Sequence, residues 1–217
     1  MKKPIVLFWT LLLLLISTAH ATVTGAFNTG VDNSGALLPY TASPGTLDPH
    51  YVLAIGSPSG TPAVVINPST FPAGNGTWLT DASSPASQWI GPLADFDSNG
   101  FYAFSGVFDY LLTVNAASTD TLSGRWASAN IADILLGTTM TGNVIAGFNS
   151  TDFQFWHPFT ISGFANGSNI LDFQVVNLGQ NPTGLRVEFI QAVPEPASLL
   201  MLASGLVLLG LQRRRPK

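Results

Sequence analysis

Apolar and polar residues alternate along the second half of this chain with the two-residue period of a half-buried β-strand. The segment 170–177 is apolar at every second position, and the segment 184–191 repeats the pattern. We predict that these two strands are antiparallel partners joined by the loop 178–183, which carries an Asn-Pro turn signal. Six residues should then face one core: Leu171, Phe173, Val175, Leu185, Val187 and Phe189.

The charged residues of the same two strands occupy the intervening positions. Arg186 and Glu188 should therefore lie together on the outer face, with Asp172 near enough for cross-strand pairing. A slip of one residue would turn the apolar set outward, so the alternation determines which face is buried.

Other short segments give the same strand signal, and no stretch of the body has a convincing helical period. In 101–110, Tyr102, Phe104, Phe108 and Tyr110 share a face, and in 121–129 Trp126 points inward. The segments 121–129 and 132–137, separated by a short break, are predicted to form a hairpin. These further strands are expected at 51–56, 63–67, 101–110, 121–129 and 132–137. Many short strands with alternating faces predict an all-β fold, a β-sandwich.

The two ends of the chain differ from this body. Two lysines precede the apolar stretch 5–16, and Ala19 and Ala21 supply the small residues of a signal peptidase site. We therefore predict a signal peptide over 1–21, a helix cleaved before Thr22; the alternative is an uncleaved anchor, for which the stretch is short.

The C-terminus carries a second apolar run, 197–211, without a charge. As a helix it would reach about 22 Å against a hydrocarbon core of about 30 Å, a marginal transmembrane span. Basic clusters stay on the cytoplasmic side, so the arginines at 213–215 orient this helix and place the body outside the cytoplasm.

A short box precedes this apolar run and an arginine cluster follows it, within 193–217. The residues are Val193, Pro194, Glu195, Pro196, Arg213, Arg214 and Arg215. This order of elements resembles the PEP-CTERM proteins of Gram-negative bacteria, in which a Val-Pro-Glu-Pro box, an apolar helix and an Arg cluster form a sorting signal. The resemblance implies an inner-membrane precursor that a membrane-embedded exosortase recognises and cleaves, in organisms that make exopolysaccharide. An ordinary tail anchor is the alternative.

The net charge of the exported domain, 22–192, limits the classes of partner that it can bind. It contains two arginines and no lysine against ten aspartates and one glutamate, a net charge of −9. Nucleic acids and anionic polymers bind surfaces rich in basic residues, which this domain lacks. Neutral glycans, cations and proteins remain as partners. The chain has no cysteine, which excludes disulfides and thiol chemistry.

The first part of the domain, 22–92, is rich in proline and loops, whereas about 100–190 carries a recognisable set of strand residues. These residues are Trp126, Ala127, Asn130, Gly137, Gly167, Asn169, Leu171, Phe173, Val175 and Asn177. With them, the order of strands resembles the galactose-binding-domain-like jelly rolls that accompany many glycoside hydrolases. Positions 129 and 136 depart from the pattern, with Ala and Leu in place of Asp and Asn. The resemblance implies a jelly-roll scaffold and transfers no binding site.

The sequence matches the known catalytic motifs only in part. The segment 56–60 has the glycines of a nucleophile elbow, but Pro58 occupies the position of the serine. His50 and His157 stand far apart in sequence, without the close His/carboxylate spacing of a zinc site. We therefore predict no catalytic residues and no enzyme activity, with a hydrolase as a remote alternative.

One segment resembles the start of a calcium loop. Asp95, Asp97 and Asn99 stand at positions 1, 3 and 5, and Gly100 at position 6 allows the sharp turn. The bidentate glutamate of position 12 is replaced by Gly106, so any calcium site would be weak. The favoured interpretation is an Asp/Asn turn with no cofactor.

Three tryptophans are candidate sugar platforms, because they lie in or beside loops: Trp78, Trp89 and Trp156. We predict a non-catalytic, glycan-contacting protein of the cell surface or extracellular matrix. The alternative is a purely structural matrix protein without a small ligand.

Overall fold

The computed structural model describes residues 23–42, 44–54, 60–70, 72–74, 76–95, 105–146, 152–179 and 181–190. The described residues form twelve β-strands and a single short 3-10 helix, so the predicted all-β class is confirmed. The strands are β1 (Leu47–Leu53), β2 (Thr61–Val65), β3 (Ala82–Ser83), β4 (Ala86–Ser87), β5 (Ile90–Gly91), β6 (Gly106–Ala116), β7 (Leu122–Ala129), β8 (Ile131–Leu136), β9 (Thr139–Ile145), β10 (His157–Ile161), β11 (Gly167–Asn177) and β12 (Gly184–Ile190); the helix η1 is Asp152–Gln154.

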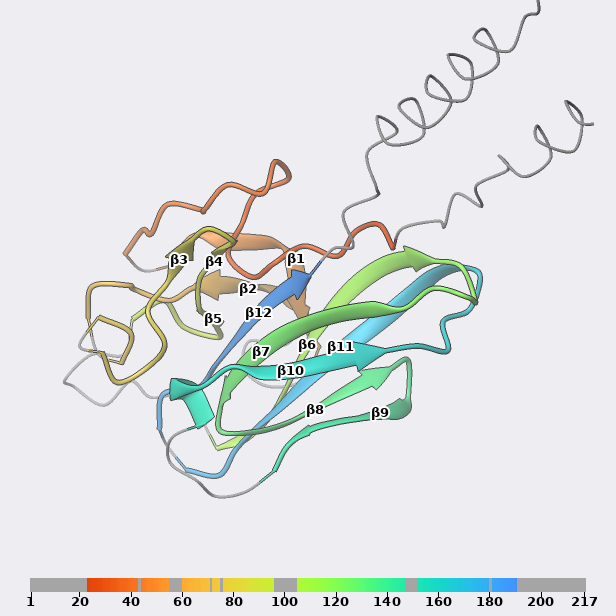
Figure 1. Cartoon of the computed structure of the whole chain (residues 1–217). Helices are drawn as coiled ribbons and strands as arrows, with labels where there is room; N and C mark the ends of the chain where they lie inside the picture. The colour runs from red at the N-terminus through yellow and green to blue at the C-terminus, as the bar shows by residue number, and fades with distance from the viewer. Residues whose placement is uncertain are drawn as a thin grey trace, which may run out of the picture.

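Ten of these strands form one antiparallel sheet in the order β10-β7-β12-β5-β2-β1-β6-β11-β8-β9. The sheet curls so that its two edge strands meet (Figure 1). There the side chain of Asn143 on β9 bonds the backbone of Thr160 on β10: Nδ2 donates to the carbonyl at 3.0 Å, and Oδ1 accepts from the amide at 3.3 Å. The sheet is thus nearly closed, with a seam between β9 and β10.

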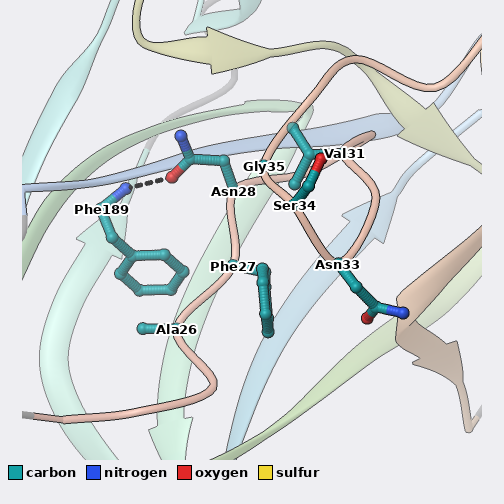
Figure 2. Close-up of a pocket in the computed structure, with 8 residues that line it drawn as sticks. All are labelled: Ala26, Phe27, Asn28, Val31, Asn33, Ser34, Gly35 and Phe189. Carbon is teal, nitrogen blue, oxygen red and sulfur yellow. Dashed lines mark hydrogen bonds between the residues drawn. The ribbon is translucent and has the colours of Figure 1, made fainter.

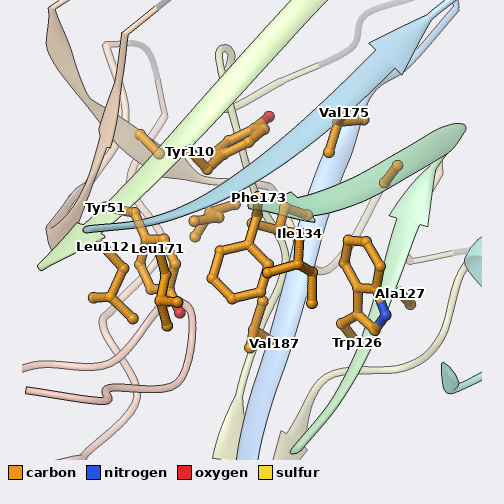
Figure 3. Close-up of a cluster of buried hydrophobic side chains, with 14 of the residues drawn as sticks. Tyr51, Tyr110, Leu112, Trp126, Ala127, Ile134, Leu171, Phe173, Val175 and Val187 are labelled. Carbon is orange, nitrogen blue, oxygen red and sulfur yellow. The ribbon is translucent and has the colours of Figure 1, made fainter. Parts of the chain in front are cut away.

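Phe173 occupies the centre of the core that the curled sheet encloses, and its side chain is fully buried. Its ring centroid lies 6.0 Å from that of Trp126 and 6.2 Å from that of Tyr51, and Figure 3 shows it between these two side chains. Phe159 and Phe189 contact it edge-on from β10 and β12, at 6.2 and 6.4 Å. Strands from both walls of the sheet therefore pack on one aromatic residue.

The predicted core face is correct, but the predicted pairing of the last two strands is wrong. All six alternating apolar residues are buried. However, β11 pairs with β6 and β8, whereas β12 pairs with β7 and β5. The two strands lie in opposite walls and meet through side chains across the core. Alternation identifies the face of each strand that turns toward the core but not its hydrogen-bonded neighbour, because either wall satisfies the same pattern.

The predicted hairpin of 121–129 with 132–137 is also wrong. β7 pairs with β10 and β12, and β8 pairs with β9 and β11. Only Asn130 separates β7 from β8, while the commonest hairpin loops contain two residues. The chain therefore passes from one wall to the other at this point.

The other strand predictions agree with the structure where it describes them. β1 and β2 overlap 51–56 and 63–67, and Trp126, Phe108 and Tyr110 are buried. Tyr102, Phe104 and the predicted signal and sorting segments lie outside the described residues. No helix within the described ranges has the length and apolar character needed to cross a membrane.

Candidate functional site

A buried ion cluster lies on the outer face of β12, where the sequence predicted solvent-exposed charges. Arg186 is only 1% exposed; it donates two hydrogen bonds to the Ser87 hydroxyl, at 2.9 and 3.0 Å, and others to the Leu79 and Thr80 carbonyls. Glu188, equally buried, lies 3.5 Å from Arg186 and accepts a bond from Ser87 at 2.5 Å.

Arg125 on the adjacent strand β7 completes this cluster, with its Nη2 atom 2.5 Å from Glu188 Oε2. Asp172 is on another wall, so the predicted pairing with Arg186 is wrong. The segment 79–89, which contains β3 and β4, packs on this face of β12 and bonds Arg186, which explains why these charges are not in solvent. Both arginines of the exported domain are thus engaged by one glutamate.

Trp156, one of the three predicted platforms, lies against the same cluster. The Arg125 and Arg186 guanidinium carbons are 4.5 and 4.8 Å from its ring centroid, within the range of cation–π contacts. The half-buried indole thus packs on two cations of the protein.

Trp78 and Trp89 do not present a ring to solvent, and the prediction that they are exposed platforms is wrong. They are 4% and 0% exposed, their ring centroids are 4.4 Å apart, and the Trp89 indole donates to the Leu79 carbonyl at 2.8 Å. Large aromatic side chains beside loops still bury their area when a core lies within reach.

Asp95 is the only described member of the calcium candidate; Asp97 and Asn99 lie outside the described residues. Its carboxylate accepts hydrogen bonds from the Tyr40 hydroxyl, at 2.6 and 2.7 Å to its two oxygens, and from the Asn67 amide at 2.8 Å. Within the described ranges no group of three or more His, Cys, Asp or Glu side chains could hold a metal ion. Through these bonds Asp95 links its own segment to the loops that contain Tyr40 and Asn67.

The two candidate histidines, His50 and His157, lie in different parts of the domain. His157 Nε2 lies 3.7 Å from Asp152 Oδ1, which is longer than a hydrogen bond. The His50 ring stacks on Phe27, with centroids 3.7 Å apart and planes 4° from parallel. The two histidines are therefore not parts of one site.

The stacked Phe27 ring forms part of an aromatic pocket, defined by the residues drawn in Figure 2. The pocket has a volume of about 250 Å³. Phe27 is half-buried and Phe189 forms the inner wall. Its lining comprises Ala26, Phe27, Asn28, Val31, Asn33, Ser34, Gly35 and Phe189.

Hydrogen bonds fix the shape of the aromatic pocket. Asn28 Oδ1 accepts from the Phe189 amide at 2.8 Å, a bond drawn in Figure 2, and its Nδ2 donates to the Ala86 carbonyl at 2.9 Å. Asp32 Oδ1 accepts from the amide and hydroxyl of Ser34, at 2.8 and 2.6 Å, and from the Ala36 amide at 3.0 Å. The bond from the Ser34 hydroxyl is the main reason that the pKa of Asp32 lies below its ordinary value. This turn places exposed Asn33 at the rim.

Sequence reasoning missed this pocket. Phe27 stands outside the alternating segments, and its partner His50 is 23 positions away. Only the stacking of two segments of the folded chain brings them together, so no local pattern pointed to them.

A second pocket, with a volume of about 570 Å³, lies at the end of the seam where β9 begins and β10 ends. Met140 and Ile170, which are 65% and 45% exposed, are among its apolar residues. None of its described lining residues is ionisable. These residues are Leu136, Gly137, Thr139, Met140, Thr141, Ser162, Gly163, Ala165, Ser168, Asn169 and Ile170.

A carboxyl group lies on the outer face of the β6-β11-β8 wall. Asp172 is paired in the register with Leu111 on one side and Leu135 on the other, and its Oδ1 is buried without a hydrogen-bond partner among the described residues. Burial, and secondarily the nearby Asp109, raises the pKa of Asp172 to about 7. Burial likewise raises the pKa of Asp81 to about 6, although Arg186 opposes the shift.

We expect Asp172→Asn to stabilise the protein at pH 8 and to have little effect at pH 4. Between pH 4 and 7 the folded state keeps a proton that the unfolded state releases, so the contribution of wild-type Asp172 falls as the pH rises through this range. The gain at pH 8 should be about 1–2 kcal/mol, after discounting for solvent near this half-exposed group. Melting temperatures at both pH values measure it. Asp133→Asn, on the same face of β8, is the control; equal pH profiles for wild type and Asp172→Asn would contradict the prediction.

Comparison with known proteins identifies one part of the chain. Residues 192–215 match the PEP-CTERM protein-sorting motif. No curated protein and no solved structure shows significant similarity. The motif indicates an exported protein whose membrane-anchored precursor is sorted by an exosortase.

Proposed function

We propose that this exported protein contacts neutral glycan through the aromatic pocket, without catalysis, at the cell surface or in the extracellular matrix. The observation that carries the proposal is the Phe27 ring, which His50 holds rigid by stacking at 3.7 Å. An aromatic ring held in this way loses little conformational entropy on binding the apolar face of a sugar. The amide of Asn33 at the rim supplies a polar group for a sugar hydroxyl.

Charge supports a neutral ligand over an anionic one. The exported domain has two arginines and no lysine, and Glu188 binds both arginines within 3.5 Å. The described lining residues of the aromatic pocket include no arginine, lysine or other ionisable side chain. An anionic polysaccharide would meet a net charge of −9 without compensation.

The finer fold assignment belongs to the same proposal. We interpret the curled antiparallel sheet as a jelly-roll-like β-sandwich, the scaffold that the sequence resemblance implies. Such folds often bind ligands with surface residues while the scaffold remains unchanged.

Binding of the full chain to a panel of neutral and anionic oligosaccharides tests this function, in a detergent without sugar head groups. We expect saturable binding to neutral members, weakened at least tenfold by Phe27→Ala and several-fold by Asn33→Ala. Phe155→Ala is the matched control, because Phe155 is 58% exposed and outside the pocket. Absence of binding to every member, or equal binding by Phe27→Ala, would favour the purely structural alternative.

A further inference from the structure

The two ends of the described chain emerge at the same end of the sheet. β12 finishes at Ile190, which pairs with Ser123 at the start of β7. Thr24 pairs with Asn115 near the end of β6, and Ala116 pairs with Gly167 at the start of β11. We call this the tether end; it comprises 23–26, 116–121, 136–141, 162–170 and Ile190. Figure 1 shows β6 and β12 running toward it.

The tether end differs from the rest of the domain in charge. Its described segments contain one ionisable residue, Asp120, although the exported domain contains eleven carboxylates. Asp120 is only 7% exposed, and its carboxylate accepts a hydrogen bond from the Ala117 amide at 2.7 Å. The exposed surface of this end therefore carries hydroxyls, amides and apolar groups, with almost no charge.

Large apolar side chains project from the same end. Met140, Ile170 and Ile190 are 65%, 45% and 64% exposed. The loops that surround them are held together, since the Ser118 amide donates to Asn166 Oδ1 at 2.7 Å and buried Phe164 packs beneath. These side chains thus stand on a fixed, uncharged surface.

The chain beyond Ile190 limits how far this end can lie from the membrane. Six residues separate Ile190 from the apolar run that begins at 197. Fully extended, that distance is about 20–25 Å. The eleven-residue strand β11 is itself about 36 Å long, so the linker is shorter than the domain. In an anchored precursor, the tether end is the end that the linker keeps near the bilayer.

We propose that in the membrane-anchored precursor the tether end binds the lipid bilayer surface, with Met140, Ile170 and Ile190 in contact with the interfacial region. Uncharged polar groups and exposed apolar side chains suit this region, and the acidic residues of the domain are kept away from anionic head groups. The second pocket opens on the tether end, so the same contact covers it until exosortase cleavage frees the domain. The proposal requires the anchored precursor and does not depend on glycan binding.

Single cysteines test this contact directly, because the chain has none of its own. The full precursor carrying Met140→Cys is reconstituted in lipid vesicles and labelled with an environment-sensitive fluorophore. We expect lipids brominated near the head group to quench this label by at least half. We also expect a bulky maleimide to modify unlabelled Met140→Cys at least fivefold more slowly in vesicles than in detergent.

Leu178→Cys is the matched control, since Leu178 is 54% exposed and follows β11 at the opposite end. Its label should escape quenching, and its modification rate should be similar in vesicles and detergent. Equal quenching at both positions would indicate a domain lying on its side, and no quenching at either would indicate a domain held off the membrane. Either result would overturn the proposal, whether or not the protein binds glycan.

Discussion

Phe173→Ala should lower the free energy of unfolding by about 3–5 kcal/mol. The ring is fully buried and contacts aromatic side chains from four other strands, including Trp126 and Phe189. Its removal forfeits the free energy gained when the ring moves from water into the core. It also leaves a cavity that strands from two walls would have to close. Urea-induced unfolding of the variant and the wild type measures the difference.

Gln174→Ala is the control in the same strand, one position away on the outer face. This half-buried side chain donates one hydrogen bond, to Asp109 at 3.0 Å, so we expect a loss of no more than about 1 kcal/mol. A larger loss for Gln174→Ala than for Phe173→Ala would show that the face assignment of β11 is wrong.

Glu188→Gln should destabilise the protein by a similar amount, about 3–5 kcal/mol. The change keeps the shape of the side chain but removes the negative charge that faces Arg186 and Arg125. Arg186 is then left as a buried cation without the carboxylate that pairs with it, although Asp81 still attracts it electrostatically, and burial already lowers the pKa of Arg186. The melting temperature should fall accordingly.

The double variant Arg186→Met/Glu188→Leu separates charge from packing. Replacement of a buried ion pair by apolar residues of similar volume is often nearly neutral, because the cost of removing both charges from water disappears. We therefore expect the double variant to be more stable than Glu188→Gln. If it is less stable, the hydrogen bonds to Ser87 and the 79–80 carbonyls outweigh the electrostatic cost.

The alternation of apolar and polar residues within a single strand was enough to predict its core-facing residues. The alternation in 170–177 and 184–191 predicted which six apolar residues face the core, because side chains at every second position of a strand lie on the same face. The sorting signal was equally readable, since its box, apolar run and arginines are contiguous in sequence.

The candidate site was not predictable in the same way. The sequence indicated tryptophans beside loops, but two of them are buried in the core and the third packs on Arg125 and Arg186. Exposure of an aromatic residue depends on which other segments reach it. The pocket at Phe27 depends on His50, and no local pattern links these two residues.

The sequence by itself therefore determined the strand class, the buried faces, the acidic and lysine-free character of the exported domain and its route of export. Only the tertiary structure decided that β11 and β12 lie in opposite walls, that Arg186 is buried and that an uncharged end carries the tether. The reason is physical: periodicity and composition act within a segment, whereas partner choice and burial of a polar group depend on segments that only folding brings together.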